Sequence, residues 1–368
     1  MQHKSQPTSS SRDKVFKIIR GRVVSSLISF VLATATATLF IMLAGFDVVE
    51  AYKAMLIGAF GSVITVSDVM AKATPLLFTG LAVAIALRAG LFNIGVEGQL
   101  LLGAMAASQI GLIQGLPGWV AIPLAMLAAA IVGALWGMVP AILKARFGAH
   151  EVITTIMLNY VVVLFTGYLA NYPLHAEGEM MPATITVPAS VQLPRLVSGS
   201  QLTIGLFIAV ACALVLKFLL ERSVLGYEIR AVGLNAQAAE AKGISQVKSW
   251  LIAMAIGGAM AGLAGGTEVL GIHRRFVEGF SPGYGFDGIA VALMGYSDPL
   301  GAVAAALVIG AIRTGAMVMD RATRIPVDFV VVIQGLLLVF LAIPGLLSFL
   351  RQRKRETPAS GDMVEDEQ

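Results

Sequence analysis

Residues 98–143 read GQLLLGAMAASQIGLIQGLPGWVAIPLAMLAAAIVGALWGMVPAIL and contain no Asp, Glu, Lys or Arg. An α-helix rises about 1.5 Å per residue and needs about 20 apolar residues to cross a bilayer core of about 30 Å. This run of 46 uncharged residues is therefore long enough for two crossings. The turn signal Gly115-Leu116-Pro117-Gly118 divides it. The segment predicts two membrane-spanning helices joined by a short turn.

The composition of the whole chain shows the same bias. Its 368 residues are 57% hydrophobic and 13% charged, whereas soluble domains are typically about 45–50% apolar and about 25% charged. This composition excludes a soluble enzyme, and it excludes disorder, which requires low hydrophobicity and high net charge. Further long stretches without charge lie at 23–46, 73–87, 152–176, 196–216, 249–267 and 329–350.

We therefore predict an all-α fold, a polytopic transmembrane helical bundle with about ten spans. The expected helices are 23–45, 70–89, 97–115, 119–143, 152–172, 202–220, 249–271, a short one near 286–297, 300–319 and 329–350. They form a transmembrane domain over 23–350, between an N-terminal tail at 1–22 and a C-terminal tail at 351–368. The first apolar run is too long for the core of a cleaved signal peptide. Two points stay open: 51–66 is weakly amphipathic and suits the membrane interface, and 286–297 either crosses the bilayer or is re-entrant.

The basic residues predict the orientation, because cytoplasmic loops carry an excess of Lys and Arg. Eighteen of the 26 basic residues fall on the inner side when both termini are placed in the cytoplasm. The exceptions between 272 and 328 are Arg274, Arg275, Arg321 and Arg324. Both tails are therefore expected to be cytoplasmic.

Two loops are long enough to carry structure of their own. The Pro-rich loop 173–200 is expected outside, as ordered coil or short strands over the outer mouth. The loop 221–248 is expected inside, with a helical middle from Asn235 to Lys242. Asn235 suits the N-cap of that helix and Gly243 suits the position after its end.

No catalytic or metal-binding pattern occurs in the sequence. The four histidines are far apart, and the single cysteine, Cys212, excludes an internal disulfide and a cysteine zinc site. Neither a phosphate-binding loop nor a GxSxG elbow is present. We expect no catalytic residue, metal, bound cofactor or nucleic-acid partner. The spacing of Gly258, Gly262 and Gly266 is typical of close helix packing in membranes.

The segment 88–104, RAGLFNIGVEGQLLLGA, places Asn93, Glu97 and Gln99 among four glycines. Glycines at this density predict a broken helix, whose free backbone groups must line a cavity or a protein contact rather than face lipid. A carboxylate within a membrane segment is costly unless it is paired, so Glu97 is a candidate functional residue. Structural hydrogen bonding, contact with a transported solute and gating all remain open for these three side chains.

A second polar stripe lies in 151–160, EVITTIMLNY. Asn159 and Tyr160 lie deep enough in the expected helix to face a pathway, and Phe92 is available nearby as a stacking partner. Glu268 is a third candidate, near the outer end of its helix. Four aspartates at expected helix ends are interpreted as caps: Asp287, Asp298, Asp320 and Asp328.

Four blocks of the sequence resemble a known family. They are 74–104 (TPLLFTGLAVAIALRAGLFNIGVEGQLLLGA), 151–160, 226–244 (GYEIRAVGLNAQAAEAKGI) and 286–312 (FDGIAVALMGYSDPLGAVAAALVIGAI). Together they resemble the permease subunits of ABC importers of the branched-chain amino acid and simple-sugar superfamily. Within that superfamily the chain is most similar to the permeases of nucleoside-type importers.

The resemblance implies a transport subunit in a bacterial inner membrane, without an ATPase of its own. Its implied partners are membrane lipid, a second permease, cytoplasmic ATP-binding subunits and an extracytoplasmic substrate-binding protein or lipoprotein. ATP and Mg²⁺ would bind to the ATP-binding subunits. The block 226–244 would be the coupling helix that docks on them, and the coupling positions are Arg230, Gly233, Asn235, Ala238, Ala239 and Gly243.

Two alternatives to nucleoside import remain. A sugar or branched-chain amino acid permease differs only in its substrate, and the sequence discriminates weakly between these solutes. An ion-coupled transporter that works alone would show paired broken helices. The segment 88–104 and a possible partner near 283–301 fit that pattern.

Overall fold

The computed structural model describes residues 31–325 together with residues 332 and 335. The chain divides into two compact units, one of residues 1–48 with 328–368 and one of residues 49–327. In the first unit an apolar helix runs from Val31 to Leu43, inside the predicted span 23–45. The tails 1–22 and 351–368 lie outside the described residues, as does the predicted span 329–350 apart from residues 332 and 335.

The second unit is helical over most of its described length. Its α-helices are α2 (Val48–Phe60), α3 (Val63–Arg88), α4 (Val96–Ile110), α5 (Gly118–Phe147), α6 (Glu151–Asn171), α7 (Gly205–Arg222), α8 (Val224–Leu234), α9 (Ala236–Glu240), α10 (Gln246–Glu268), α11 (Tyr284–Met294) and α12 (Pro299–Thr323). A 3₁₀ turn, η1 (Ala189–Val191), lies in the outer loop, and a π-helical turn, η2 (Val269–His273), follows α10. Among the described residues, only two isolated β-bridges occur beside these helices.

Five helices are long and apolar enough to cross a membrane: α3, α5, α6, α10 with η2, and α12. They confirm the predicted helices at 70–89, 119–143, 152–172, 249–271 and 300–319. In contrast, α4 has 15 residues and α11 has 11. At about 1.5 Å per residue they are about 22 Å and about 16 Å long, so neither crosses a core of about 30 Å alone. The expectation of a full span at 97–115 is wrong for this reason.

The segment 51–66 is not one amphipathic helix, because it is interrupted between α2 and α3. Ser62 caps α3: its Oγ accepts a hydrogen bond from the backbone N of Thr65, and the Thr65 hydroxyl accepts one from the backbone N of Ser62. This reciprocal capping box ends the preceding helix and starts the next. As a result, α3 begins seven residues earlier than the helix predicted at 70–89.

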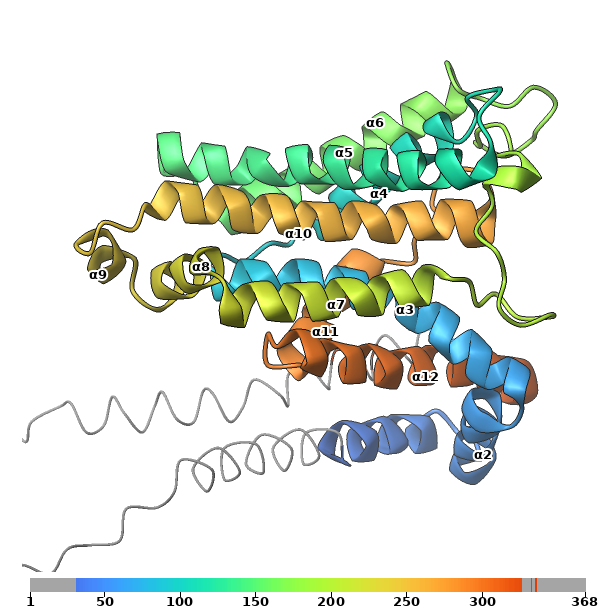
Figure 1. The fold of residues 1–368 in the computed structure, drawn as a ribbon. Coiled ribbons are helices and arrows are strands. Elements are labelled where there is room, and N and C mark those ends of the chain that lie inside the picture. Colours follow the sequence, from blue (N-terminus) through green and yellow to red (C-terminus); the bar gives the residue numbers. More distant parts are fainter. Residues whose placement is uncertain (1–30, 326–331, 333–334, 336–368) are drawn as a thin grey trace, which may run out of the picture. The chain divides into compact units, whose positions relative to one another are not determined.

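Helix α10 packs against α5, α4 and α3 (Figure 1). Small residues make these contacts close. An added Cβ at Gly258 or Gly262 would collide with the backbone of α5, and one at Gly103 would collide with the backbone of Gly262. Close backbone approach of this kind is how membrane helices gain packing energy. The interpretation of the glycine spacing in α10 as a packing surface is confirmed.

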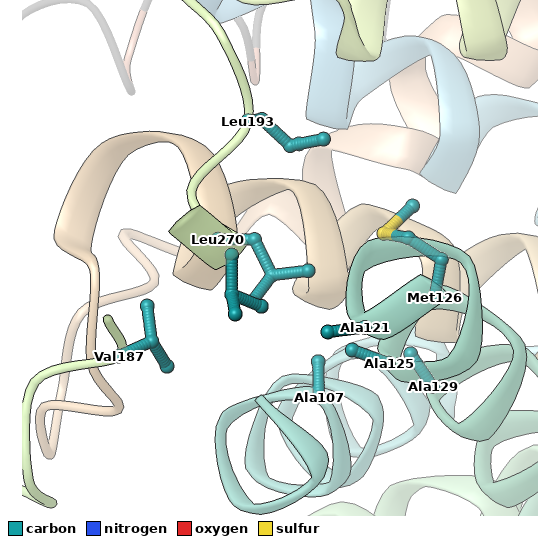
Figure 2. Packing of buried hydrophobic residues seen from close by; sticks show 9 residues of the cluster. Ala107, Ala121, Ala125, Met126, Ala129, Val187, Leu193 and Leu270 are labelled. Atoms are coloured by element: carbon teal, nitrogen blue, oxygen red, sulfur yellow. The ribbon is translucent and has the colours of Figure 1, made fainter. Parts of the chain in front are cut away.

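The two long loops lie at opposite ends of this unit, with α8 and α9 at one end and the loop after α6 at the other (Figure 1). The loop 173–200 is ordered, as expected. The backbone N of Val187 donates to the Arg274 oxygen at 2.7 Å, and the N of Leu193 donates to the Leu270 oxygen at 2.9 Å. Figure 2 shows Val187 and Leu193 beside Leu270 of η2 and Ala107 of α4. Apolar packing therefore anchors this loop to the ends of the helices.

Candidate functional site

The chain between α3 and α4 is not helical, which confirms the predicted break in 88–104. Gly90 has φ +74°, a left-handed conformation that favours glycine. Asn93 stabilises the turn that follows, because its Oδ1 accepts a 2.9 Å hydrogen bond from the backbone N of Gly95. The break therefore replaces helical hydrogen bonds with side-chain bonds.

Asn159 of α6 holds the same break from the neighbouring helix. Its Oδ1 accepts from the backbone N of Gly98 at 2.9 Å, and its Nδ2 donates to the oxygen of Ile94 at 2.8 Å. Asn93 Nδ2 also donates to Gln99 Oε1 at 3.2 Å. The structure thus brings Asn93, Gln99 and Asn159 together, all buried, with their amides engaged in holding the irregular backbone and one another.

A second broken segment meets the first. Residues 274–283 lead from the loop 173–200 into the short helix α11, whose second residue is Gly285. The backbone N of Gly285 donates to Glu97 Oε2 at 2.6 Å, and the hydroxyl of Ser281 bonds to the same carboxylate. The first turns of α4 and α11 are therefore in direct contact. A Cβ at Gly285 would collide with the backbone of Glu97, so this approach requires glycine.

Further charged side chains surround this contact. Asp287 forms an ion pair with Arg313 of α12, and Arg313 lies 5.6 Å from the ring centroid of Tyr284. On α3, Lys72 Nζ lies 3.4 Å from the Tyr284 hydroxyl. The interpretation of Asp287 as a cap is wrong: it lies in the first turn of α11 but pairs across to another helix. We did not single out Arg313, although a basic residue inside the span predicted at 300–319 is itself a signal.

The two aromatic candidates for the pathway, Tyr160 and Phe92, differ in their surroundings. Tyr160 is 63% exposed and lies on the outer surface of α6, whereas its neighbour Asn159 is buried. Phe92 is half-buried in the break. Successive residues on a helix point about 100° apart, which explains why only one of the pair faces the break.

Glu268 is buried at the end of α10, and its Oε2 lies 3.6 Å from Nε2 of His273. It lines a cavity of about 10 Å³ together with Thr74, Thr203 and Thr267. A cavity of this size holds about one water molecule. It is too small for a nucleoside or a sugar. Within the described part of the chain, no group of three potential metal ligands occurs.

The loop 221–248 contains two short helices instead of the single one expected. α9 is the predicted helix, and Asn235 is its N-cap, with Oδ1 accepting from the backbone N of Ala238 at 2.9 Å. Gly243 has φ +81°, which fits the predicted stop. Ser223 is the N-cap of the unexpected α8, and its hydroxyl accepts from the backbone N of Gly226 at 3.0 Å.

The predicted coupling positions differ in their exposure. Ala238 is exposed, but Ala239 is buried within the chain. Arg230 is half-buried and its Nε donates to the oxygen of Gly226 at 3.3 Å. Gly233 contacts the break between α3 and α4: a Cβ on Gly90 would lie 3.2 Å from the Gly233 Cα. Only part of the predicted set is therefore available to a partner protein.

Comparison with known proteins identifies the family. Residues 65–342 match the profile of the branched-chain amino acid transport system permease component. The guanosine ABC transporter permease protein NupP of Bacillus subtilis is 38% identical over 91% of this chain and 97% of its own length. The nucleoside ABC transporter permease protein NupB of Lactococcus lactis is 32% identical over 92% of this chain and 96% of its own. A glucose ABC transporter permease protein of Haloferax volcanii is 34% identical over 80% of each.

This chain therefore belongs to the branched-chain amino acid transport system permease component family. It is a multi-pass membrane protein and a permease subunit of an ABC importer. Permease subunits are not themselves enzymes. Membership in this family also implies ATPase and substrate-binding partners.

Proposed function

We propose that this permease moves nucleosides from an external substrate-binding protein into the cytoplasm. The observation that carries the proposal is the 38% identity to a guanosine permease over nearly the full length of both chains. The similarity to a glucose permease, 34% over 80% of each chain, makes a sugar the second candidate.

The charges in the structure support an orientation. Basic residues gather at the end of the bundle that carries α8 and α9: Arg88, Lys144, Arg146, Lys217, Arg222, Arg230, Lys242 and Lys248. Since cytoplasmic loops are enriched in Lys and Arg, we place this end in the cytoplasm of a bacterial inner membrane. The ordered loop 173–200 then faces the substrate-binding protein. In this proposal both termini are cytoplasmic.

The exposed part of the inner loop suits a docking surface for an ATP-binding subunit. Leu234 is 88% exposed between α8 and α9, and Ala238 is exposed on α9. Apolar and small side chains at a protruding helix pair permit close contact with a protein groove. In this proposal ATP and Mg²⁺ bind to that subunit, and this chain binds no cofactor. A second permease completes the translocation pathway.

The substrate proposal is tested with the complete importer in proteoliposomes. The chain is reconstituted with its second permease, its ATP-binding subunits and its substrate-binding protein. Uptake of radiolabelled guanosine, glucose and leucine is then measured with and without internal ATP. ATP-dependent guanosine uptake is the expected result. ATP-dependent uptake of glucose or leucine, without guanosine, would instead assign the importer to that solute.

The paired short helices α4 and α11 also match the pattern of ion-coupled transporters. A second arm of the same experiment addresses this alternative. Liposomes that contain this chain alone are given a sodium or proton gradient. We expect no uptake, because the family works with ATPase subunits. Gradient-driven uptake by the single chain would overturn the importer assignment.

Docking on the ATP-binding subunit is tested at Ala238. Ala238→Trp places a large side chain on the exposed face of α9, so we expect ATP-dependent uptake to be lost while membrane insertion is retained. Ala239→Trp is a poor test, because Ala239 is buried and the indole would disturb this chain itself. The control is Ala211→Trp on the exposed surface of α7, which leaves the inner loop unchanged. Normal uptake by Ala238→Trp would contradict the docking assignment.

A further inference from the structure

We infer that the contact between Glu97 and Gly285 is a gate in the transport cycle, on which the inner and outer loops act from opposite ends. The inference rests on the proposed import function and assigns Glu97 a gating role rather than a solute-binding one. Three sets of contacts among the described residues carry it: those from the inner loop to α4, those from the outer loop to α11, and those of the Glu97 carboxylate.

The inner loop reaches Glu97 through the first break. Gly233 of α8 packs directly on the end of α3, where an added Cβ would collide with the oxygen of Arg88 and lie 3.0 Å from the N of Gly90. Only six residues separate Gly90 from Glu97, and they contain the hydrogen-bonded turn of Asn93. A displacement of α8 must therefore move the chain that leads into α4.

The outer loop reaches Gly285 through the second break. The backbone N of Thr184 donates to the Phe276 oxygen at 2.9 Å, and the N of Glu278 donates to the Pro182 oxygen at 2.9 Å. Arg275 adds an ion pair to Glu179 at 2.5 Å. The segment 274–283 is thus joined to the loop 173–200 and then continues into α11. A protein docked on that loop would press on the chain that leads to Gly285.

The carboxylate of Glu97 lies where the contacts from the inner loop and those from the outer loop meet. Two groups bond to it: the hydroxyl of Ser281, within the segment 274–283, and the backbone N of Gly285, in the first turn of α11 that follows this segment. Glu97 itself belongs to α4, the helix that follows the break contacted by Gly233 of α8. Glu97 is only 6% exposed and its oxygen is occupied by α11, so little of it remains for a solute. Separating α4 from α11 would strip a buried carboxylate of its donors, which favours two discrete states over a continuous range.

If this contact is a gate, its removal should uncouple ATP hydrolysis from solute import and leave substrate recognition unchanged. Coupling is a free-energy relation between sites, so it is measured directly as ATP hydrolysed per solute imported. In the reconstituted importer, Glu97→Ala should raise that ratio at least threefold and raise ATP hydrolysis in the absence of the binding protein. The KM for the loaded binding protein and the preference among nucleosides should stay within twofold of the wild type.

Two further variants complete the experiment. Ser108→Ala is the matched control: Ser108 is buried on α4 but bonds within its own helix, to the oxygen of Met105, so its ratio should equal that of the wild type. Glu97→Gln retains a side-chain oxygen that can accept from Gly285, and its ratio should lie between those of the wild type and Glu97→Ala. This variant carries the test if Glu97→Ala fails to assemble.

The outcomes separate the gate from its alternatives. Suppose that Glu97→Gln changes the preference among nucleosides but leaves the ratio of ATP hydrolysed per solute imported unchanged. This result would contradict the gate and show that Glu97 contacts the solute. Lower assembly with an unchanged ratio for each assembled complex would overturn it in favour of a purely structural role. Failure of the wild-type importer to take up nucleosides with ATP would instead contradict the proposed function. Uptake by the wild-type importer is therefore measured before any variant is tested.

Discussion

Arg88, the last residue of α3, donates a 2.8 Å hydrogen bond from its Nε to the backbone oxygen of Ser297, in the turn between α11 and α12. Tyr296 and Ser297 have φ values of +54° and +52°, which residues other than glycine rarely adopt. Each such residue costs about 1–3 kcal/mol and persists only where surrounding contacts hold it. The guanidinium of Arg88 is one of these contacts, so the end of α3 stabilises a strained turn that is distant in sequence.

Replacing Arg88 should destabilise this turn. We expect Arg88→Ala to lower the free energy of unfolding by about 1.5–3 kcal/mol, the range for a hydrogen bond from a charged group. Thermal unfolding of the purified protein in detergent measures the change. Ser297→Gly removes the backbone strain, so the same Arg88 substitution should cost less in that background. Equal costs in both backgrounds would show that Arg88 does not hold the turn.

Asn159 should matter much more than its neighbour Tyr160. Asn159→Ala leaves the buried backbone N of Gly98 and the oxygen of Ile94 without partners. Each unpaired buried group costs about 1–3 kcal/mol. We expect a clear fall in the thermal midpoint and in the yield of folded protein. Tyr160→Ala removes an exposed ring and should leave both nearly unchanged; a larger fall for Tyr160→Ala would refute the ranking.

Gly262 lies where α10 meets both α5 and α4, and it has no room for a side chain. Gly262→Val should cost at least about 1–3 kcal/mol through overpacking. The measurement is the fraction of monodisperse protein after extraction, followed by thermal unfolding. Ala211→Val adds carbon atoms to an exposed position on α7 and serves as the matched control. Similar behaviour of the two variants would contradict the close packing of α10.

Asp298 gives the start of α12 an acid-sensitive contact. Burial tends to raise the pKa of Asp298, but hydrogen bonds from Lys217 and from the backbone of Gly301 and Leu300 outweigh it and hold the pKa below its ordinary value of 3.8. Lys217 Nζ lies 2.5 Å from the carboxylate. A depressed carboxyl pKa contributes stability that is present above the ordinary value and is lost as the pH falls below it.

We therefore expect wild-type stability to fall with acid below about pH 4 more steeply than that of Asp298→Asn. Asn also caps helices well, so the variant keeps the start of α12 and removes the ion pair alone. At neutral pH its loss should be no more than about 1 kcal/mol, as for partly exposed pairs. Unfolding measured in a pH series checks this, and parallel curves for both proteins would contradict it.

The sequence predicted the helices better than it predicted the contacts between them. Uncharged length located the five spans, and the glycines around Asn93 located the break before α4. Helix length was less predictable, because α4 ends at Ile110 while its apolar composition continues. The capping box of Ser62 moved the start of α3, which is a local effect that a charge count does not detect.

The candidate site shows where sequence reasoning stops. Polar residues of 88–104 and Asn159 were predicted as separate pathway candidates, and the structure brings them together. The partner of Glu97 is Gly285, which carries no side chain and leaves no polar signal in the sequence. Asp287 and Arg313 are 26 residues apart in the sequence, and only the packing of α11 on α12 makes them a pair.

The short length of α4 also has a consequence for the synthesis of the protein. Its packing surface is supplied by α10, through the contacts of Gly103 with Gly262 and of Leu100 with Gly265. Translation proceeds from the N-terminus at about 5–20 residues per second, so α10 begins to emerge roughly 7 to 27 s after α4 is complete. During that interval α4 is too short to settle in the bilayer alone. A nascent chain stopped before Gln246 should therefore leave α4 accessible to water-soluble labels.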